Sequence, residues 1–313
     1  MSPDPIRPPV LVPGDTVRVV SPSGPPTRER VAAGVALLES WGLRVEFAPH
    51  AFDRHGYLAG TDEDRVADLN AALRDERVRG VICSRGGYGT TRIIDRVDFA
   101  AARRDPKPVT GYSDITALFQ GLYIHSGISA VHGPVLTTFA TDHDPGTVES
   151  FRRALMSDEP LIVTARDTEE TARLTTGDTT VTGRLLGGNL TLVADAIGTG
   201  TLPDLTGAIV YLEEIDEAPY RADRILTQLL RSGALDTVSG FALGQFTSCT
   251  DPDGDRTIVD VLHDRLGGLG VPILGGLPFG HGDNPRTLPY GTTAALDPVA
   301  GVLTAVAPLR GRA

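Results

Sequence analysis

The residue best placed to act as a nucleophile is Ser113. It lies in Val109-Thr-Gly-Tyr-Ser-Asp-Ile-Thr116, where a short apolar run that predicts a strand leads through a glycine-containing turn into a predicted helix. A serine on such a turn is held out of the sheet, and the next backbone N–H points to where an oxyanion would form. The match to a nucleophile elbow is partial, because Ile115 stands where the usual pattern has its second glycine. The alternative is that Ser113 or Asp114 only caps the helix.

A glycine-rich loop, Cys83-Ser-Arg-Gly-Gly-Tyr-Gly89, follows a second predicted strand and precedes a helical pattern. Glycines let the backbone approach a ligand closely, so the loop could offer N–H groups to an oxyanion or a phosphate. It is not the Gly-x-Gly-x-x-Gly dinucleotide fingerprint. The alternative is a tight turn between strand and helix. Cys83 itself is more typical of a small buried side chain than of a nucleophile.

A serine nucleophile needs a base, and His281 is the best candidate. It lies in Leu277-Pro-Phe-Gly-His-Gly282, where flanking glycines give an imidazole room to approach a separate domain. The alternative is a loop histidine bonded to backbone. His132 ends an apolar run and could line a site. The other histidines lie in polar loops or at helix ends, where an exposed or capping role is favoured: His50, His55, His125, His143 and His263.

A carboxylate that orients the base is expected from the acidic segment after the apolar run Ile209-Val-Tyr-Leu212. Ligands of α/β sheets gather at the carboxyl ends of strands, so this segment is well placed. Period-two alternation puts Glu213 and Glu214 on opposite faces, so only one should point into a site, and the spacing leaves the choice open. The other acids, Asp216 and Glu217, are read as a solvated turn and an acidic helix start. Beyond them, Arg221 and Arg224 could bind a carboxylate or form surface salt bridges.

The chain carries 29 Lys and Arg residues, of which only Lys107 is a lysine. It lies in Asp-Pro-Lys-Pro without a phosphate-binding loop before it, which excludes Schiff-base and P-loop chemistry. Six residues of extended chain would separate Lys107 from Ser113 by about 20 Å, so the base must be a histidine. The two cysteines, Cys83 and Cys249, fit neither a disulfide framework nor a zinc site. No metal and no cofactor is predicted.

The net charge is −11 and the basic residues are dispersed, which argues against a nucleic-acid partner. No stretch contains 18 uninterrupted apolar residues, and the N-terminal segment has no apolar signal-peptide core. We therefore expect no membrane association and a cytoplasmic location.

The length of 313 residues predicts two domains. In the first half, short apolar runs alternate with helical patterns, which is typical of a mostly parallel sheet covered by helices. Between residues 157 and 183 the composition shifts to Thr, Asp and Glu, so we place domains at 1–165 and 166–313. The patterns predict strands at 17–20, 43–47, 80–83, 108–110, 208–212 and 240–245, and helices at 27–41, 61–73, 114–125, 189–197, 220–231 and 258–266.

Six motifs in order resemble the LD-carboxypeptidases, serine peptidases of bacterial cell-wall recycling. The resemblance runs from about residue 17 to about residue 300, and its motifs are Gly80-Val-Ile-Cys-Ser-Arg-Gly-Gly-Tyr-Gly89, Gly111-Tyr-Ser-Asp-Ile-Thr-Ala-Leu118, His132-Gly-Pro134, Gly183-Arg-Leu-Leu-Gly-Gly-Asn-Leu190, Leu212-Glu-Glu214 with Tyr220-Arg-x-Asp-Arg224, and Gly276-Leu-Pro-Phe-Gly-His-Gly282. It implies an α/β fold, with an N-terminal parallel-sheet domain of flavodoxin-like or glutamine-amidotransferase-like type and a smaller, β-rich α+β C-terminal domain.

The resemblance assigns a Ser-His-Glu triad to Ser113, His281 and Glu213, and it chooses Glu213 by motif. It places the oxyanion hole at the backbone N–H groups of Gly87 and Asp114. Nucleophile and base would come from different domains and meet at the cleft between them. Four further residues are expected to bind substrate: Arg85, Tyr88, His132 and Arg221.

The implied reaction releases terminal D-Ala from muropeptide tetrapeptides, by hydrolysis of an L,D-peptide bond through an acyl-enzyme. The partner is therefore a small peptide substrate, and the resemblance also implies a homodimer. A second branch, the microcin C immunity peptidases, resembles the chain almost as well and would cleave an aminoacyl or peptidyl adenylate analogue. The resemblance to that branch implies a pocket in which aromatic side chains stack on the nucleobase. Trp41, the only tryptophan, lies far from every motif, and this favours the cell-wall peptide as the substrate. A third alternative is a non-enzymatic α/β protein that binds an anion at the Gly86–Gly89 loop.

Overall fold

The computed structural model describes residues 4–251 and 254–312 and divides the chain into two compact units. The first unit holds the described residues up to Glu159, together with Thr287–Gly291 and the residues from Ala307 onward. The second unit holds Pro160–Arg286 and Thr292–Val306. Two C-terminal segments therefore belong to the first unit, which a single division at residue 165 does not include.

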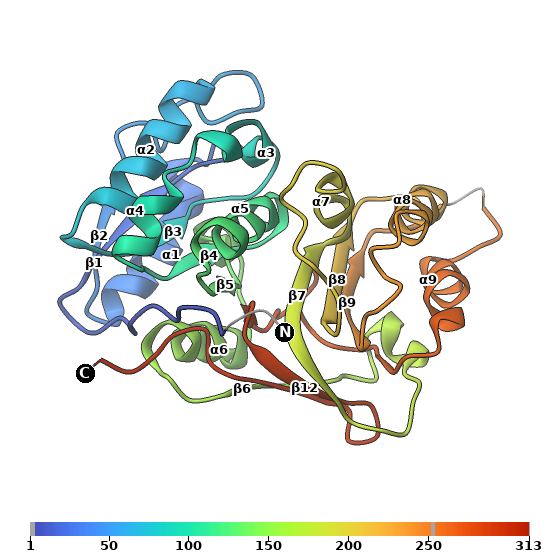
Figure 1. Cartoon of the computed structure of the whole chain (residues 1–313). Coiled ribbons are helices and arrows are strands. Elements are labelled where there is room, and N and C mark those ends of the chain that lie inside the picture. Colours follow the sequence, from blue (N-terminus) through green and yellow to red (C-terminus); the bar gives the residue numbers. More distant parts are fainter. Residues whose placement is uncertain (1–3, 252–253, 313) are drawn as a thin grey trace. The chain divides into compact units, whose positions relative to one another are not determined.

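The first unit is built on a mostly parallel sheet with the strand order β11-β5-β4-β3-β1-β2 among the described residues. β11 pairs antiparallel with β5, and the other pairs are parallel. The strands are β1 (Thr16–Val20), β2 (Arg44–Phe47), β3 (Val78–Cys83), β4 (Val109–Gly111), β5 (Ala130–His132) and β11 (Leu288–Tyr290). Figure 1 shows the helices around this sheet: α1 (Arg28–Ser40), α2 (Asp62–Arg74), α3 (Thr90–Ile93), α4 (Phe99–Arg104), α5 (Thr116–Gly121) and α6 (Pro145–Met156).

Local signals explain most of these elements. The helix predicted at 61–73 is confirmed as α2, and a capping box starts it, because the Thr61 side chain accepts from the Asp64 N–H and the Asp64 carboxylate accepts from the Thr61 N–H. The helix predicted at 114–125 is instead divided into a 3₁₀ turn at Ser113–Ile115, α5, and a π-helical turn at Leu122–Ser126. Gly127, with φ +67°, then ends the helical segment in the left-handed conformation.

The second unit contains one sheet with the order β10-β9-β8-β7-β12-β13-β6 among the described residues. The strands β7 to β10 run parallel, and β12, β13 and β6 add an antiparallel extension. The strands are β6 (Leu161–Thr164), β7 (Val181–Asn189), β8 (Ile209–Ile215), β9 (Gly240–Thr247), β10 (Ile273–Leu274), β12 (Thr293–Asp297) and β13 (Val302–Ala305).

Three helices of this unit follow the parallel strands in the chain: α7 (Leu190–Asp195), α8 (Pro219–Arg231) and α9 (Ile258–Leu266). In Figure 1, α8 and α9 lie beside β8 and β9. The segment 157–183, where the composition shifts to Thr, Asp and Glu, contains β6, the 3₁₀ turn at Glu170–Leu174 and the start of β7. Thr171 in this segment is fully buried, and its hydroxyl is satisfied by donating to the Gly244 carbonyl of β9 at 3.0 Å.

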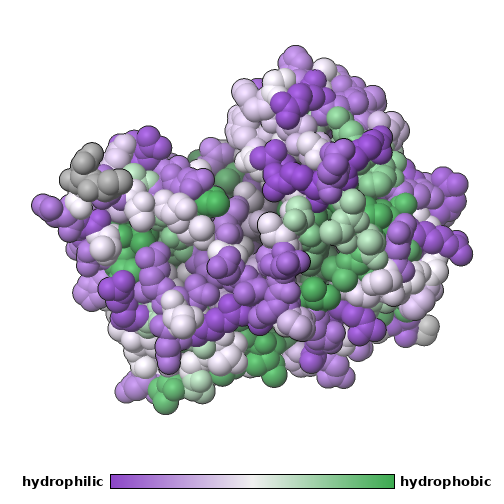
Figure 2. Space-filling model, turned by 180° about the vertical axis from the view of Figure 1, so that it is seen from behind, coloured by the Kyte–Doolittle hydropathy of each residue, from purple (hydrophilic) through white to green (hydrophobic). Residues whose placement is uncertain are grey.

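Figure 2 shows hydrophilic side chains over most of the face seen from behind, with hydrophobic side chains in smaller areas. In the part of the chain that the structure describes, no helix has the length and apolar character needed to cross a bilayer.

Candidate active site

Ser113 lies on a sharp turn directly after β4. The strand ends at Gly111, Tyr112 is extended, and Ser113 adopts φ +65°, a left-handed conformation that non-glycine residues rarely take. A side chain on Gly111 would lie 2.8 Å from the Ile115 side chain. Ile115 thus fills the space beside Gly111, which accounts for the departure from the usual elbow pattern. Ser113 has the strained geometry of a nucleophile elbow and is not an ordinary helix cap.

The glycine-rich loop after β3 lies against this serine. A Cβ added to Gly86 would be 2.8 Å from Ser113 Cβ and 3.0 Å from its Oγ, so only glycine fits there. Gly87 follows with φ +118°, and the loop is anchored by a 3.1 Å bond from the Gly24 N–H to the Gly86 carbonyl. The glycine-rich loop and Ser113 thus lie side by side within the first unit, and an oxyanion hole at the N–H groups of Gly87 and Asp114 stays a prediction.

The Asp114 side chain connects the turn to the same loop. Its buried carboxylate accepts hydrogen bonds from Ser23 Oγ at 2.6 Å and from the Thr90 N–H at 2.8 Å. Burial raises the pKa of this carboxyl, while these hydrogen bonds act in the opposite direction. The Asp114 side chain therefore connects the turn that carries Ser113 to Ser23 and to the start of α3 at Thr90, and it does not act only as a helix cap.

His281 and Glu213 form a hydrogen-bonded pair in the second unit. The imidazole Nδ1 lies 2.6 Å from the Glu213 carboxylate Oε2, and the glutamate is fully buried. Gly280, between Phe279 and His281, has φ +116°, and a Cβ there would lie 2.8 Å from the Glu213 side chain. Burial lowers the pKa of His281, but the negative charge of Glu213 and the hydrogen bond to it outweigh burial, so this pKa lies above its usual value. An imidazole held this way presents Nε2 as a base.

The neighbouring Glu214 has a different role. Its carboxylate accepts from Asn189 Nδ2 at 2.6 Å, from the Thr191 N–H at 2.9 Å and from Thr191 Oγ1 at 2.7 Å. An irregularity in the pairing of β8 with β9 lies between Leu212 and Glu214, and the two acids have separate partners. The geometry thus makes Glu213 the partner of the histidine and makes Glu214 a brace between β8 and the start of α7. Sequence reasoning missed this brace, although Asn189 lies in one of the six motifs.

Two predicted substrate-binding residues lie on the glycine-rich loop. Arg85 donates to the Pro25 carbonyl at 3.2 Å. Tyr88 is 48% exposed and its ring lies 5.9 Å from that of Tyr57, so the two form an accessible aromatic pair. Their role in binding stays a prediction.

The other two are placed differently. His132 is buried at the end of β5, with its ring 6.3 Å from that of Tyr112 and 6.5 Å from that of Phe119. These contacts are typical of a core side chain. Arg221, on α8, is exposed, and its Nε donates to Tyr220 Oη at 3.1 Å. Direct contact of either residue with a substrate stays a prediction.

The side chains of Lys107, Cys83 and Cys249 are buried and have structural roles. The buried Lys107 ammonium bonds to the Asp105 carboxylate at 2.7 Å and to the Leu73 carbonyl at 2.8 Å. Cys83 is fully buried, and burial raises its thiol pKa far above the usual range. Burial also raises the pKa of Cys249, to about 12. The prediction that Cys83 is a small buried side chain is confirmed.

One side-chain group among residues 4–251 and 254–312 has ligand atoms close enough together for a metal ion: His50, Asp53 and Asp64. Its members already have partners. His50 Nδ1 lies 2.7 Å from Asp53, and Asp64 accepts from the Thr61 N–H in the capping box. The group therefore has a structural explanation at the start of α2.

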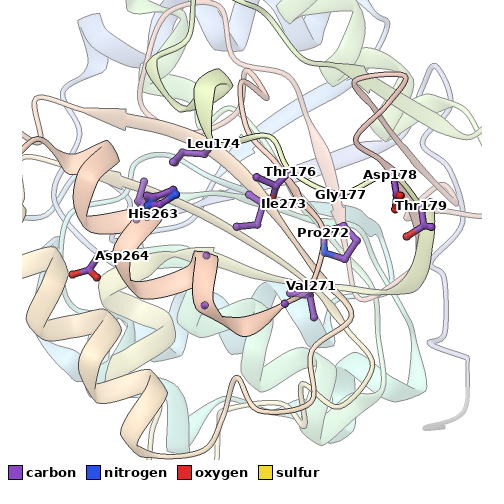
Figure 3. Close-up of a pocket in the computed structure, with 14 residues that line it drawn as sticks. Leu174, Thr176, Gly177, Asp178, Thr179, His263, Asp264, Val271, Pro272 and Ile273 are labelled. Carbon is purple, nitrogen blue, oxygen red and sulfur yellow. The ribbon is translucent and has the colours of Figure 1, made fainter.

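Two cavities of the second unit lie near opposite ends of its parallel strands. A cavity of about 530 Å³ is lined by side chains that include Leu174, His263 and Ile273 (Figure 3). Since Ile273 pairs with Phe241 near the start of β9, this cavity is not at the carboxyl edge that carries Glu213. A second cavity, of about 390 Å³, adjoins the His281 loop and is lined by Gln245, Gly282 and Asp283 among others.

Two family models match the chain. The model described as the LD-carboxypeptidase N-terminal domain matches residues 17–133, and the model of the LD-carboxypeptidase C-terminal domain matches residues 182–296. The first contains Ser113 and the glycine-rich loop, and the second contains Glu213 and His281.

Curated relatives and solved structures agree with these models. A putative carboxypeptidase of Streptomyces coelicolor is 42% identical, with 96% of each chain covered. The murein tetrapeptide carboxypeptidase of Pseudomonas aeruginosa is 32% identical over 90% of this chain and 92% of that one. The muramoyltetrapeptide carboxypeptidase of Oxalobacter formigenes superposes with a TM-score of 0.81 at 31% identity, covering 93% and 97% of the two chains. The microcin C7 self-immunity protein MccF superposes with a TM-score of 0.87 at 25% identity, covering 96% and 98%.

These matches extend over both units and over every motif on which the resemblance was based. The expected fold class is confirmed, and so is the expected class of enzyme, a peptidase. The chain belongs to the LD-carboxypeptidase family.

Proposed function

We propose that the protein is a serine carboxypeptidase that hydrolyses the L,D-peptide bond of muropeptide tetrapeptides and releases terminal D-Ala. The observation that carries this proposal is the 2.6 Å pair of His281 Nδ1 and the buried Glu213 carboxylate. Such a pair orients a histidine as a general base. The strained turn at Ser113 supplies the matching nucleophile.

The proposed acylation begins with attack of Ser113 Oγ on the carbonyl carbon of the L-centre. His281 Nε2 takes the serine proton as the O–C bond forms, and Glu213 stabilises the resulting imidazolium. The N–H groups of Gly87 and Asp114 would receive the oxyanion. When the C–N bond breaks, the proton passes from His281 to the leaving amine, and D-Ala departs.

In deacylation, water is the nucleophile and Ser113 Oγ is the leaving group. His281 takes a proton from water as the water oxygen attacks the acyl carbon. The bond to Ser113 Oγ then breaks, and the serine recovers a proton from the imidazolium. The product is the shortened peptide with a free carboxylate at its L-centre. The proposal requires Ser113 of the first unit and His281 of the second unit to act on the same bond.

The peptide substrate is favoured over an adenylate by two observations. The murein peptide relatives are more similar in sequence than the solved MccF structures, which include one in complex with aspartyl sulfamoyl adenosine. In addition, Trp41 packs edge-to-face on Phe151 of α6, with ring centroids 5.9 Å apart, and so has a structural role inside the first unit.

The direct test is to incubate the enzyme separately with a muropeptide tetrapeptide and with an aminoacyl sulfamoyl adenylate and to follow products by mass. The proposal expects loss of one alanine from the tetrapeptide. Cleavage of the adenylate alone would establish the MccF-type activity instead. A fluorophosphonate probe that leaves Ser113 unlabelled, without either cleavage, would point to a protein that only binds an anion.

The proposal also includes a cytoplasmic homodimer. Both features rest on the family resemblance, and muropeptide recycling suits a cytoplasmic enzyme. Light scattering coupled to size exclusion tests the dimer, because a mass near 33.1 kDa would show a monomer.

A further inference from the structure

His281 is carried by a loop from Pro278 to Arg286. The base of this loop is closed by a 2.6 Å bond from the Arg286 N–H to the Pro278 carbonyl. Within it, Asn284 has φ +51°, and glycines stand on both sides of the histidine. Such a segment has little intrinsic rigidity, so the position of the imidazole depends on what holds the loop.

One buried side chain, Gln245 near the end of β9, fills the inside of this loop. Its Oε1 accepts from the Gly282 N–H at 3.0 Å, and its Nε2 donates to the Asp283 carbonyl at 3.0 Å. The Gln245 backbone N–H donates to the Phe279 carbonyl at 2.9 Å. Gln245 therefore bonds to the loop on both sides of His281.

The glycines around His281 reflect the same arrangement. A Cβ on Gly280 would lie 2.8 Å from the Glu213 side chain, and a Cβ on Gly282 would lie 2.5 Å from Gln245. Glu213 and Gln245 are on adjacent parallel strands at the same edge of the sheet, since Leu212 pairs with Leu243 and Glu214 with Phe246. The histidine is thus held between two strand ends, by the Glu213 carboxylate at its ring and by the Gln245 amide at the backbone of the two residues that follow it.

Only an amide suits this position. It must accept one hydrogen bond from an N–H and donate two, since Nε2 also donates to Glu169 Oε1 at 3.0 Å. The Glu169 carboxylate itself lies 3.7 Å from the Arg166 guanidinium. A carboxylate in place of Gln245 would face Glu169 and the Asp283 carbonyl with no donor. An aliphatic side chain would leave the Gly282 N–H, the Asp283 carbonyl and the Glu169 carboxylate without this partner.

We propose that Gln245 is a positioning residue for the reaction: its amide fixes the 278–286 loop and so holds the His281 imidazole in line with Glu213. The inference rests on the proposed role of His281 as the base. Since Gln245 acts through the loop, its loss should lower kcat and change KM little, because positioning errors of about 1 Å can cost on the order of 10²-fold.

The test uses Gln245→Leu and Gln245→Glu in the full chain, with D-Ala release from tetrapeptide as the assay. We expect kcat to fall by roughly 10²-fold in Gln245→Leu. In Gln245→Glu a new negative charge near His281 raises the imidazole pKa, so the acid limb of the kcat/KM profile moves to higher pH. A second readout is the proton NMR signal of the His281 Nδ1–H, expected far downfield in the wild type and lost or broadened in Gln245→Leu.

Two controls separate positioning from general damage. Gln228→Leu makes the same chemical change at an exposed position of α8, and Leu229→Ala opens a cavity at a fully buried position of that helix. Both should keep wild-type kcat and the downfield signal, even where Leu229→Ala lowers Tm as much as Gln245→Leu does. If Gln245→Leu does not fold, the kcat and the Nδ1–H signal of Gln245→Glu decide: a kcat within twofold of the wild type at the pH optimum, with the signal unchanged, would overturn the proposal.

The inference is wrong if Gln245→Leu keeps kcat within twofold of the wild type, or if its loss of activity equals that of Leu229→Ala at equal Tm. His281→Ala distinguishes this failure from failure of the proposed function. A fully active His281→Ala removes the base mechanism itself, whereas an inactive His281→Ala beside an active Gln245→Leu overturns only the role of Gln245.

Discussion

At Ser113, the effect of the hydroxyl on activity can be separated from the effect of the strained backbone on stability. At φ +65° a residue with a Cβ is strained by about 1–2 kcal/mol, and glycine is not. Ser113→Gly and Ser113→Ala both remove the hydroxyl, but only glycine relieves the strain.

We therefore expect Ser113→Gly to be more stable than Ser113→Ala by roughly 1 kcal/mol in urea unfolding, with both variants inactive. Equal stabilities, or a more stable alanine variant, would show that the turn is not strained at this residue.

The His281–Glu213 pair predicts a pH dependence with a definite sign. The base acts as neutral imidazole, so kcat/KM should fall as pH drops through the pKa of His281. Because the charge of Glu213 raises that pKa above its ordinary value of about 6.5, the acid limb should lie above this value.

Glu213→Gln removes the charge and should move the acid limb to lower pH, while kcat falls by on the order of 10⁴-fold. The pH profiles of both enzymes on the same tetrapeptide give this comparison. An acid limb that stays in place in Glu213→Gln would mean that another group titrates.

At the scale of elements, the site depends on ties between loops that follow neighbouring strands. The Asp114 carboxylate connects the turn after β4 to the start of α3, and Glu214 connects β8 to α7. Asp114→Ala would leave the Ser23 hydroxyl and the Thr90 N–H without this acceptor.

We expect Asp114→Ala to lower the free energy of unfolding by about 1–3 kcal/mol and to reduce kcat, because the turn that carries Ser113 loses its tie to the glycine-rich loop. Chemical unfolding and the D-Ala assay measure the two effects. Unchanged stability would show that the tie contributes nothing to the fold.

Sequence patterns predicted the elements well where local chemistry decides them. The strand ending at Cys83 and the capped helix after Thr61 follow from hydrophobic period and capping residues alone. The division of the segment after Ser113 into 3₁₀, α and π turns was not predictable, because tertiary packing around Ile115 and Gly121 decides it. The choice between Glu213 and Glu214 also needed the structure or the family motif, since period-two alternation allows either.

At the scale of the whole molecule, the two units differ from a simple division of the chain at residue 165. β11 completes the first sheet against β5. The segment from Ala307 onward also belongs to the first unit, where the Arg310 carbonyl accepts from the Val10 N–H at 2.9 Å. Pairing between segments more than 100 residues apart leaves no local pattern in the sequence. Composition could therefore indicate two domains, but it could not show that two C-terminal segments belong to the first one.

A fragment that ends at residue 165 should therefore be less stable than the same unit in the full chain. It lacks the strand that covers the edge of β5, and it exposes that edge to other chains. We expect a lower Tm for the fragment and aggregation on heating, measured by circular dichroism and light scattering. A Tm equal to that of the first unit in the full protein would show that the C-terminal segments do not stabilise it.

The central claim is a serine L,D-carboxypeptidase. It is tested most directly by D-Ala release from a muropeptide tetrapeptide, followed by mass spectrometry for the wild type and for Ser113→Ala. The account predicts release of one alanine by the wild type and a fall of about 10⁴- to 10⁶-fold in the variant. Release by Ser113→Ala at a rate near that of the wild type would contradict it.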